Sequence, residues 1–178
     1  MPSSIRHKVE TLGMGQPNFA TCWWASYRMM FKYWKRNLDE IDTRLAAASI
    51  DVEDCKAKGL PDTEYFKAAN TLGLVSWSGL TFNQAPGLLD IGLSDGAEAF
   101  LKELALGPLW VSKRVKGGNH IIVAVAYDDS ARTIHCNNPH PGPNDAVEQP
   151  GVDANLFVRT ITAAKGSVQA FRYKLGDS

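Results

Sequence analysis

The sequence predicts an α+β fold, in which a helical N-terminal half is followed by an antiparallel sheet. Apolar residues recur at helical spacing in several segments between residues 21 and 106. After Pro108 the pattern changes to short apolar runs separated by turn residues. The chain has 178 residues and 44% of them are hydrophobic, which is enough for one buried core. We therefore expect residues 1–178 to form a single domain.

Four helices are expected before the sheet, after an irregular arm over residues 1–15. The first begins at residue 22, and the others cover residues 42–50, 61–72 and 94–106. Thr21 is the expected N-cap of the first helix, because a hydroxyl there can accept a backbone N–H. Gly73 and Gly107 are expected to end the third and fourth helices.

Five strands are expected after Pro108, at residues 109–115, 120–127, 133–137, 156–161 and 167–173. The Asp-Asp-Ser sequence of residues 128–130 is typical of a tight turn. Residues 76–93 are expected to form a loop with short strands. Residues 139–153 contain four prolines and are expected to form a long loop. The helical half and the sheet would then meet at a cleft.

The composition excludes several classes of partner. The 19 basic and 19 acidic residues cancel, so neither a nucleic acid nor a membrane surface is expected to bind. Three cysteines do not make a disulfide framework, which favours a reducing compartment. No apolar stretch has the length of a signal-peptide core or of a membrane span. We expect a cytoplasmic protein, or one that is exported without a signal peptide.

Cys22 is the candidate nucleophile. It stands at the expected start of the first helix, where unpaired N–H groups and the helix dipole favour a thiolate. This position predicts a thiol pKa below its ordinary value. Gln16, six residues upstream, is a candidate amide donor to an oxyanion. The alternative is a buried structural cysteine, which is the role expected for Cys136, and Cys55 is expected to be incidental.

His120 is the candidate general base. It follows a glycine pair and begins the apolar run of residues 121–127, so a buried strand would hold the ring while one face stays open. His7 and His140 lie in segments that would hold a ring less firmly, and His135 is the remaining competitor. The alternative is a core histidine whose ring nitrogens are satisfied by its neighbours.

Asn137 and Asn138 are the candidates for a third group that orients the imidazole. Both end the strand after His120, and either amide oxygen could accept a ring N–H. Because neighbours on a strand point to opposite faces, only one of them can reach His120. The alternative is an ordinary turn, for which Asn-Asn-Pro is also suitable.

No metal and no other cofactor is expected. The best candidate ligands are three neighbouring residues, His135, Cys136 and His140. They are a weak candidate, because the sequence contains neither a paired Cys-x-x-Cys nor a His-Glu-x-x-His spacing.

The order of these residues resembles that of papain-like cysteine peptidases. Gln16 precedes a Cys-Trp pair at residues 22–23, and small residues follow at positions 25–26. Further matches are Leu-x-x-Gly-Pro at residues 104–108, Gly-Gly-Asn-His at 117–120 and Asn-Asn-Pro at 137–139. Within this superfamily the chain is most similar to the peptidase domains of bacteriocin-exporting ABC transporters and to small papain-like effectors of bacteria. The resemblance covers about residues 14–140.

Three positions depart from that pattern. Asn119 is inserted between the glycine pair and His120, and Trp24 occupies a position that is usually small. The bacterial group often has aspartate just before the proline, where this chain has Asn138. Papain itself uses asparagine as the orienting residue, and the match to the position before the proline selects Asn138 over Asn137.

The resemblance implies a papain-like fold, in which the helix that carries Cys22 packs on the antiparallel sheet. It also implies a cysteine endopeptidase in which Cys22 attacks the carbonyl and His120 transfers the proton. Asn138 would orient the ring, while Gln16 and the Cys22 backbone N–H bind the oxyanion. The same Cys-His site would also suit a cell-wall peptide amidase, a deamidase or a transglutaminase. A non-catalytic binding module is the other alternative.

The resemblance further suggests a biological role and a set of partners. The expected role is that of a bacterial effector or toxin, of the kind delivered by type VI secretion, which cuts a protein inside a target cell. The expected partners are this protein substrate and a cognate immunity protein that covers the cleft. We expect the protein to be a monomer.

Overall fold

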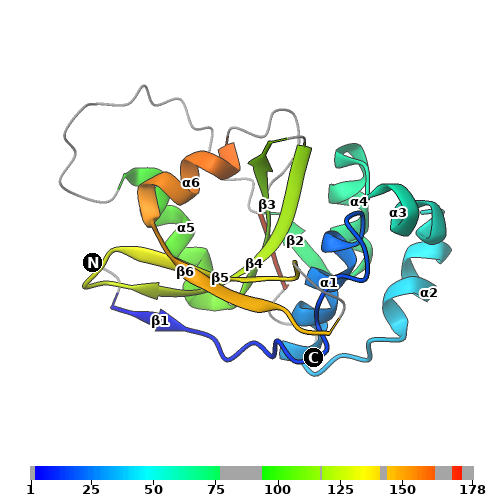
Figure 1. Ribbon diagram of the computed structural model, residues 1–178, viewed down its shortest axis with the longest axis horizontal. Coiled ribbons are helices and arrows are strands. Elements are labelled where there is room, and N and C mark those ends of the chain that lie inside the picture. Colours follow the sequence, from blue (N-terminus) through cyan, green and yellow to red (C-terminus); the bar gives the residue numbers. More distant parts are fainter. Residues whose placement is uncertain (1–2, 77–93, 117, 141–143, 163–169, 174–178) are drawn as a thin grey trace.

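The computed structural model describes residues 3–76, 94–116, 118–140, 144–162 and 170–173, and it confirms the α+β class. The helical elements are α1 (Cys22–Tyr33), α2 (Glu40–Ala47), α3 (Val52–Lys58), η1 (Asp62–Glu64), α4 (Tyr65–Thr71), α5 (Asp95–Leu106) and α6 (Ala154–Thr162). The strands are β1 (Ile5–Arg6), β2 (Leu74–Ser76), β3 (Leu109–Val115), β4 (Gly118–Asp128), β5 (Thr133–Asn138), β6 (Val147–Asp153) and β7 (Ala170–Tyr173). Helices lie on both sides of the sheet (Figure 1).

The strands form one antiparallel sheet in the order β2-β7-β3-β4-β5-β6. The long strand β4 lies near its centre and pairs with β3 through its first half and with β5 through its second half. Past the first residue of β3, the short strand β1 takes its place beside β4, with Ile5 opposite Tyr127. The arm expected to be irregular therefore contributes a strand.

The sheet is buried on both faces, which explains why β4 is a nearly continuous apolar run. Ile121 and Val123 pack into a core shared with α1 to α4. Ile122 and Ala124, which alternate with them, pack into a second core with α5 and α6. Burying a large apolar side chain stabilises the fold by about 1.5–3 kcal/mol, so these two cores hold the helices on the sheet.

Trp110 of β3 anchors the sheet to the helical half. Its ring stacks on Tyr27 of α1 at 5.1 Å and meets Tyr65 of α4 edge to face at 5.3 Å. Its Nε1 donates a hydrogen bond to the carbonyl oxygen of Trp23 at 3.2 Å. Trp23 directly follows Cys22, so this contact fixes the first turn of α1 relative to the sheet.

Several local expectations agree with the structure. The first helix begins at Cys22, and β3 covers the expected residues 109–115. The Ser94 side chain accepts the Ala97 backbone N–H and caps α5. That helix ends at Gly107, where a Cβ would lie 2.7 Å from the Trp34 ring, so a larger residue would clash. Thr21 precedes α1 but does not cap it, because its hydroxyl is turned back to Asn18, where it accepts the backbone N–H and donates to the carbonyl oxygen.

The strand expected at residues 156–161 is wrong, since these residues belong to helix α6. Phe157, Val158 and Ile161 are buried, and this spacing puts them on one side of a helix. A short apolar run does not distinguish a strand from a buried helix by periodicity alone. The missed signal is Asp153, whose carboxylate accepts the Leu156 backbone N–H at the helix start.

The long loop expected at residues 139–153 is also partly wrong, because it contains strand β6. This strand includes Pro150, which lacks an N–H and suggested a loop. β6 lies at one end of the sheet order, where one side of the strand needs no partner. A proline is tolerated at such an edge.

Other differences concern the helical half and the segments next to undescribed residues. Helix α3 was not expected, although Asp51 caps it by accepting the Asp54 backbone N–H at 3.0 Å. Two further expected segments are described only in part. Ser76, the first residue of the loop expected at 76–93, ends β2, and residues 170–173 of the strand expected at 167–173 form β7. The remainder of both segments, residues 77–93 and 167–169, lies outside the described residues.

Candidate active site

Cys22 lies at the first position of α1 and opens onto a cavity of about 320 Å³. One wall comes from the segment before α1, a second from the segment between α3 and α4, and a third from the start of β4. The lining residues are Phe19, Ala20, Cys22, Trp23, Lys58, Gly59, Leu60, Pro61, Asp62, Tyr65, Gly118, Asn119 and Ile121. The candidate nucleophile is therefore next to a space that a substrate could enter.

Burial raises the pKa of the Cys22 thiol above its ordinary value. Its side chain is in the core, with a residue exposure of 7%. Backbone hydrogen bonds from Ile121, Trp23 and Cys22 itself favour the thiolate, but they only partly offset the loss of hydration. The expected depression of this pKa is thus wrong for the protein without substrate. A helix start does favour a thiolate, but here the site has little water to solvate it.

His120 lies near the start of β4, and its Nε2 is 2.7 Å from the Asn138 Oδ1. An amide oxygen only accepts, so Nε2 carries the proton in this hydrogen bond and Nδ1 is left as the basic nitrogen. Burial lowers the pKa of His120, and the Asn138 hydrogen bond acts in the opposite direction. Nearby His140 and Lys113 lower the same pKa further. The ring is therefore held neutral and oriented.

The main chain links the strand that carries His120 to Cys22. The Ile121 backbone, next in the chain to His120, hydrogen-bonds to the Cys22 thiol. The Ser26 hydroxyl of α1 donates to the Ile121 carbonyl oxygen at 3.4 Å. Among the described residues, no direct hydrogen bond joins the Cys22 thiol to the His120 ring. Such contacts are often long before substrate binds, so this geometry is compatible with proton transfer in a complex.

Asn138, and not Asn137, faces His120. Asn137 points to the other side of β5, where it is 2% exposed and its Nδ2 donates to the Val9 carbonyl oxygen at 3.3 Å. The pairing of β4 with β5 sets this register, with Asn137 opposite Val123. Alternation along the strand then places the two asparagines on opposite faces of the sheet.

We expect Asn138→Ala to lower kcat by roughly ten- to a hundredfold with little change in KM, because misplacing a catalytic group costs about this much. Asn138→Asp should keep much of the activity, since its carboxylate still accepts the Nε2 proton. Steady-state kinetics on a peptide substrate would measure both. Asn137→Ala is the matched control, and it should reduce stability with less effect on kcat. A neutral Asn138→Ala beside a damaging Asn137→Ala would contradict the assignment.

Gln16 is buried, with an exposed fraction of 4%, and lies in the segment before α1. Its backbone N–H donates to the Pro139 carbonyl oxygen at 2.9 Å, which ties this segment to the residue after Asn138. Its side-chain Nε2 donates to the Asn18 carbonyl oxygen at 2.7 Å. Because an amide nitrogen carries two protons, one remains for an oxyanion. Its Oε1 is buried and accepts no hydrogen bond from the residues that the structure describes.

We expect Gln16→Ala to lower kcat by about a hundred- to a thousandfold, as for the loss of one oxyanion donor. KM should change little, because the developing negative charge is bound only in the transition state. Single-turnover kinetics would separate this effect from product release. Wild-type activity in Gln16→Ala would exclude Gln16 from the oxyanion site.

The pKa directions also predict how Cys22 reacts with alkylating reagents. Because burial raises its pKa, iodoacetamide should label it slowly at about pH 6 to 7, and the rate should rise with pH beyond the ordinary thiol range. Mass spectrometry would follow each cysteine separately. Cys136 is an internal control, since burial raises its pKa to about 12. Fast labelling of Cys22 that stays constant below neutral pH would instead indicate a thiolate–imidazolium pair.

The competing residues have structural partners. His7 lies between the Tyr33 hydroxyl at 3.0 Å and the Leu104 carbonyl oxygen at 2.6 Å. His135 is 3.5 Å from the Glu148 carboxylate. In the described part of the chain, no group of three His, Cys, Asp or Glu side chains is arranged to hold a metal ion. The same residues include no helix that is both long and apolar enough to cross a membrane.

Sequence reasoning missed the cavity wall formed by residues 58–65. Asn119, which departs from the family pattern, lines the cavity opposite this wall. Tyr65 supports the wall, and burial raises the pKa of its hydroxyl to about 12, so it stays neutral. A local signal was present in Asp51, which caps α3 just before the wall.

Trp24 holds this wall in place, which accounts for the large residue at a usually small position. Its ring lies 4.8 Å from the Arg28 guanidinium and 4.9 Å from the Lys56 ammonium. Its Nε1 donates to the Asp42 carboxylate at 2.7 Å, and Lys56 also binds that carboxylate. The cluster joins α1 to α2 and α3, and α3 leads directly into the cavity wall.

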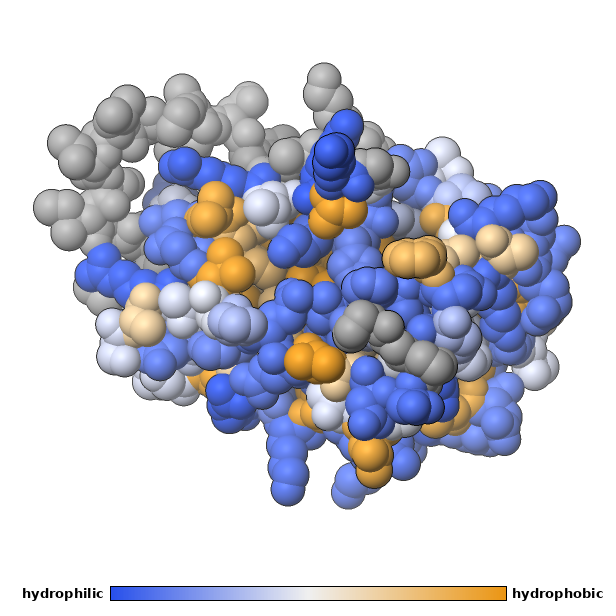
Figure 2. Space-filling model, viewed as in Figure 1, coloured by the Kyte–Doolittle hydropathy of each residue, from blue (hydrophilic) through white to orange (hydrophobic). Residues whose placement is uncertain are grey.

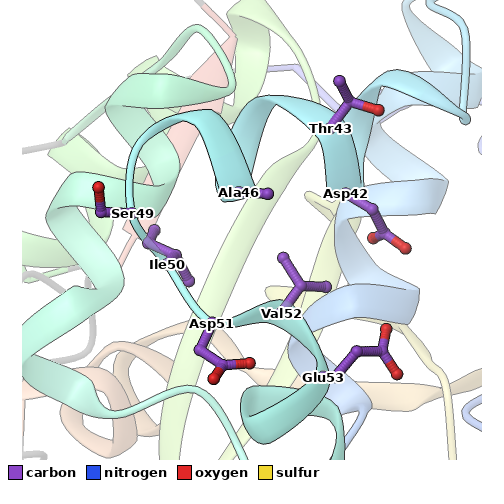
Figure 3. Close-up of a pocket in the computed structure, with 8 residues that line it drawn as sticks. All are labelled: Asp42, Thr43, Ala46, Ser49, Ile50, Asp51, Val52 and Glu53. Carbon is purple, nitrogen blue, oxygen red and sulfur yellow. The ribbon is translucent and has the colours of Figure 1, made fainter.

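A second, open cavity of about 660 Å³ lies between α2 and α3 (Figure 3). Its lining residues are Asp42, Thr43, Ala46, Ser49, Ile50, Asp51, Val52 and Glu53. None of these is a cysteine or a histidine, so this cavity lacks the thiol and imidazole pair that the sequence indicates at Cys22 and His120. On the face shown in Figure 2, hydrophilic residues cover most of the surface and the hydrophobic groups between them are small.

The chain belongs to a family of cysteine proteases. A protein-family model described as papain-like cysteine protease AvrRpt2 matches residues 4–153, most of the 178 residues. The fold and this match together define a papain-like cysteine protease, which is a hydrolase, as the resemblance implied. A search of curated proteins found no significant match.

Proposed function

We propose that the protein is an endopeptidase that hydrolyses peptide bonds with Cys22, His120 and Asn138 through a thioester. The observation that carries this assignment is the 2.7 Å hydrogen bond that orients His120, whose chain neighbours Asn119 and Ile121 line the cavity that contains Cys22. Gln16 is the proposed oxyanion donor, because its Nε2 donates one proton to the Asn18 carbonyl oxygen and retains the other for an oxyanion.

Because the Cys22 pKa is raised and the His120 pKa is lowered, the resting pair is a neutral thiol and a neutral imidazole. His120 Nδ1 takes the thiol proton as the sulfur attacks the carbonyl carbon of the substrate. The tetrahedral oxyanion accepts hydrogen bonds from Gln16 Nε2 and the Cys22 backbone N–H. Collapse breaks the C–N bond, and the imidazolium protonates the departing amine. Water, deprotonated by His120, then attacks the thioester carbonyl; the C–S bond breaks, the acid product leaves, and the imidazolium returns the proton to the Cys22 sulfur.

We further propose that this protease is a bacterial effector that acts on a protein of a target cell and has a cognate immunity protein over the cleft. The support is the resemblance to small papain-like effectors of bacteria. Co-expression with genes neighbouring its own would test this role, because an immunity protein should relieve growth inhibition by the active enzyme. Growth inhibition by Cys22→Ala equal to that by the wild type would contradict it.

The experiment that tests the enzymatic function compares new protein N-termini in bacteria that express wild type or Cys22→Ala. New N-termini should appear with the wild type and be absent from the variant. Cys55→Ala is the matched control, since Cys55 has the same 7% exposure in the same core but lies in α3. Release of peptides from purified peptidoglycan, without new protein N-termini, would instead favour a cell-wall amidase.

A further inference from the structure

His140 contacts both members of the His120–Asn138 pair. The Asn138 Oδ1 accepts two hydrogen bonds, one from His120 Nε2 at 2.7 Å and one from the His140 backbone N–H at 3.0 Å. The second bond determines the orientation of the amide, because it places the oxygen, and not the NH₂ group, toward the imidazole. An Asn138 side chain turned the other way would present a donor to Nε2 and reverse the tautomer.

The His140 ring lies between the base and the segment that precedes the nucleophile. Its centroid is 6.4 Å from that of His120, with the two rings nearly perpendicular at 84°. Its other neighbour is Phe19, at 5.4 Å and 34°. Phe19 is 87% exposed and lines the Cys22 cavity, so core packing does not explain an aromatic residue there. Pro139, which precedes His140, accepts the Gln16 backbone N–H.

We propose that His140 is a positioning residue of the protease. Its backbone N–H sets the Asn138 amide, and its ring, in contact with both Phe19 and the His120 ring, limits the movement of the imidazole. The proposal rests on the proposed function, since it assigns a role within the same site. His140 acts only through His120 and Asn138.

The ring of His140 also contributes a titratable group near the base. The charged or titratable groups that act on His120 are Lys113, directly opposite it on β3, and His140 itself. The Cys22 thiol of α1 hydrogen-bonds to the backbone of Ile121, the next residue in the chain. Positive charge on His140 or Lys113 disfavours a proton on His120. Replacing His140 with an uncharged residue should therefore raise the pKa of His120 and move the acid limb of the activity profile to higher pH.

The test compares His140→Ala with His140→Phe. Both keep the backbone N–H, but only phenylalanine keeps a ring against Phe19 and His120. We expect His140→Ala to lower kcat by roughly tenfold or more with KM nearly unchanged, since a small misplacement of the base is costly. His140→Phe should recover most of kcat, and both variants should shift the acid limb upward. His135→Ala, on β5 beside Glu148, is the control, and it should change neither kcat nor the position of the acid limb.

An NMR titration of the His120 ring in the same variants makes the test independent of any substrate. A raised His120 pKa in both His140 variants supports the proposal even if no peptide is cleaved, so it is separable from the proposed function. Wild-type kcat and an unchanged His120 pKa in His140→Ala would overturn it. Equal losses of kcat in His140→Ala and His140→Phe, with unchanged thermal unfolding, would overturn the role of the ring.

Discussion

Cys22→Ala is expected to abolish peptide-bond hydrolysis, with a loss in kcat on the order of 10⁴-fold or more. Without the sulfur no thioester forms, and neither His120 nor Gln16 can replace it as a nucleophile. The fold should persist, because the substitution removes a single side-chain atom and costs about 1 kcal/mol of stability. Activity assays together with thermal unfolding would separate the two effects.

The control for this prediction is Cys55→Ala, which removes an equally buried sulfur from the same core. It should lose a similar amount of stability and keep its activity. Appreciable turnover in Cys22→Ala, or an equal loss of turnover in Cys55→Ala, would show that the chemistry lies elsewhere. Loss of folding in Cys22→Ala alone would favour a structural cysteine.

His120→Ala is expected to cost nearly as much as Cys22→Ala. In His120→Ala the Cys22 thiol stays protonated, because burial raises its pKa and no base remains to take the proton. The two changes should not add in the double variant, since both remove the same step. His135→Ala is the matched control, because it removes a half-buried imidazole from the neighbouring strand β5.

The pH profile of the wild type supplies a second check on His120. The base must be neutral to accept a proton, so kcat/KM should fall as the pH drops through the pKa of His120. Burial lowers that pKa below its ordinary value, and the acid limb should therefore lie below the value of a free histidine, about 6.5. An acid limb above that value, or residual activity in His120→Ala, would contradict the assignment.

Much of this protein could be predicted from local sequence. The start of α1 at Cys22, the cap of α5 at Ser94 and the limits of β3 all agree with the structure. These features depend on interactions within one or two turns or on alternation along one strand, which are visible in a short window. The order of Cys22, His120 and the asparagines was sufficient to indicate the family.

Two of the elements that sequence reasoning missed, α6 and β6, depend on neighbours far along the chain. Residues 154–162 form a helix because their apolar residues find the α5 side of the sheet, and a short apolar run does not reveal that partner. Pro150 is acceptable in β6 only because the strand lies at an edge. Neither condition is encoded in the segment itself.

The candidate site likewise combines features that are local to the sequence with features that depend on distant parts of the chain. Residue type and order in the sequence were enough to name candidates for the nucleophile, the base and the oxyanion donor. The folded structure shows that Asn138 meets His120 while Asn137 bonds to Val9, since strand register selects the face. It also decided the sign of the Cys22 pKa shift, because the helix start is local to the sequence whereas desolvation depends on everything packed around the thiol.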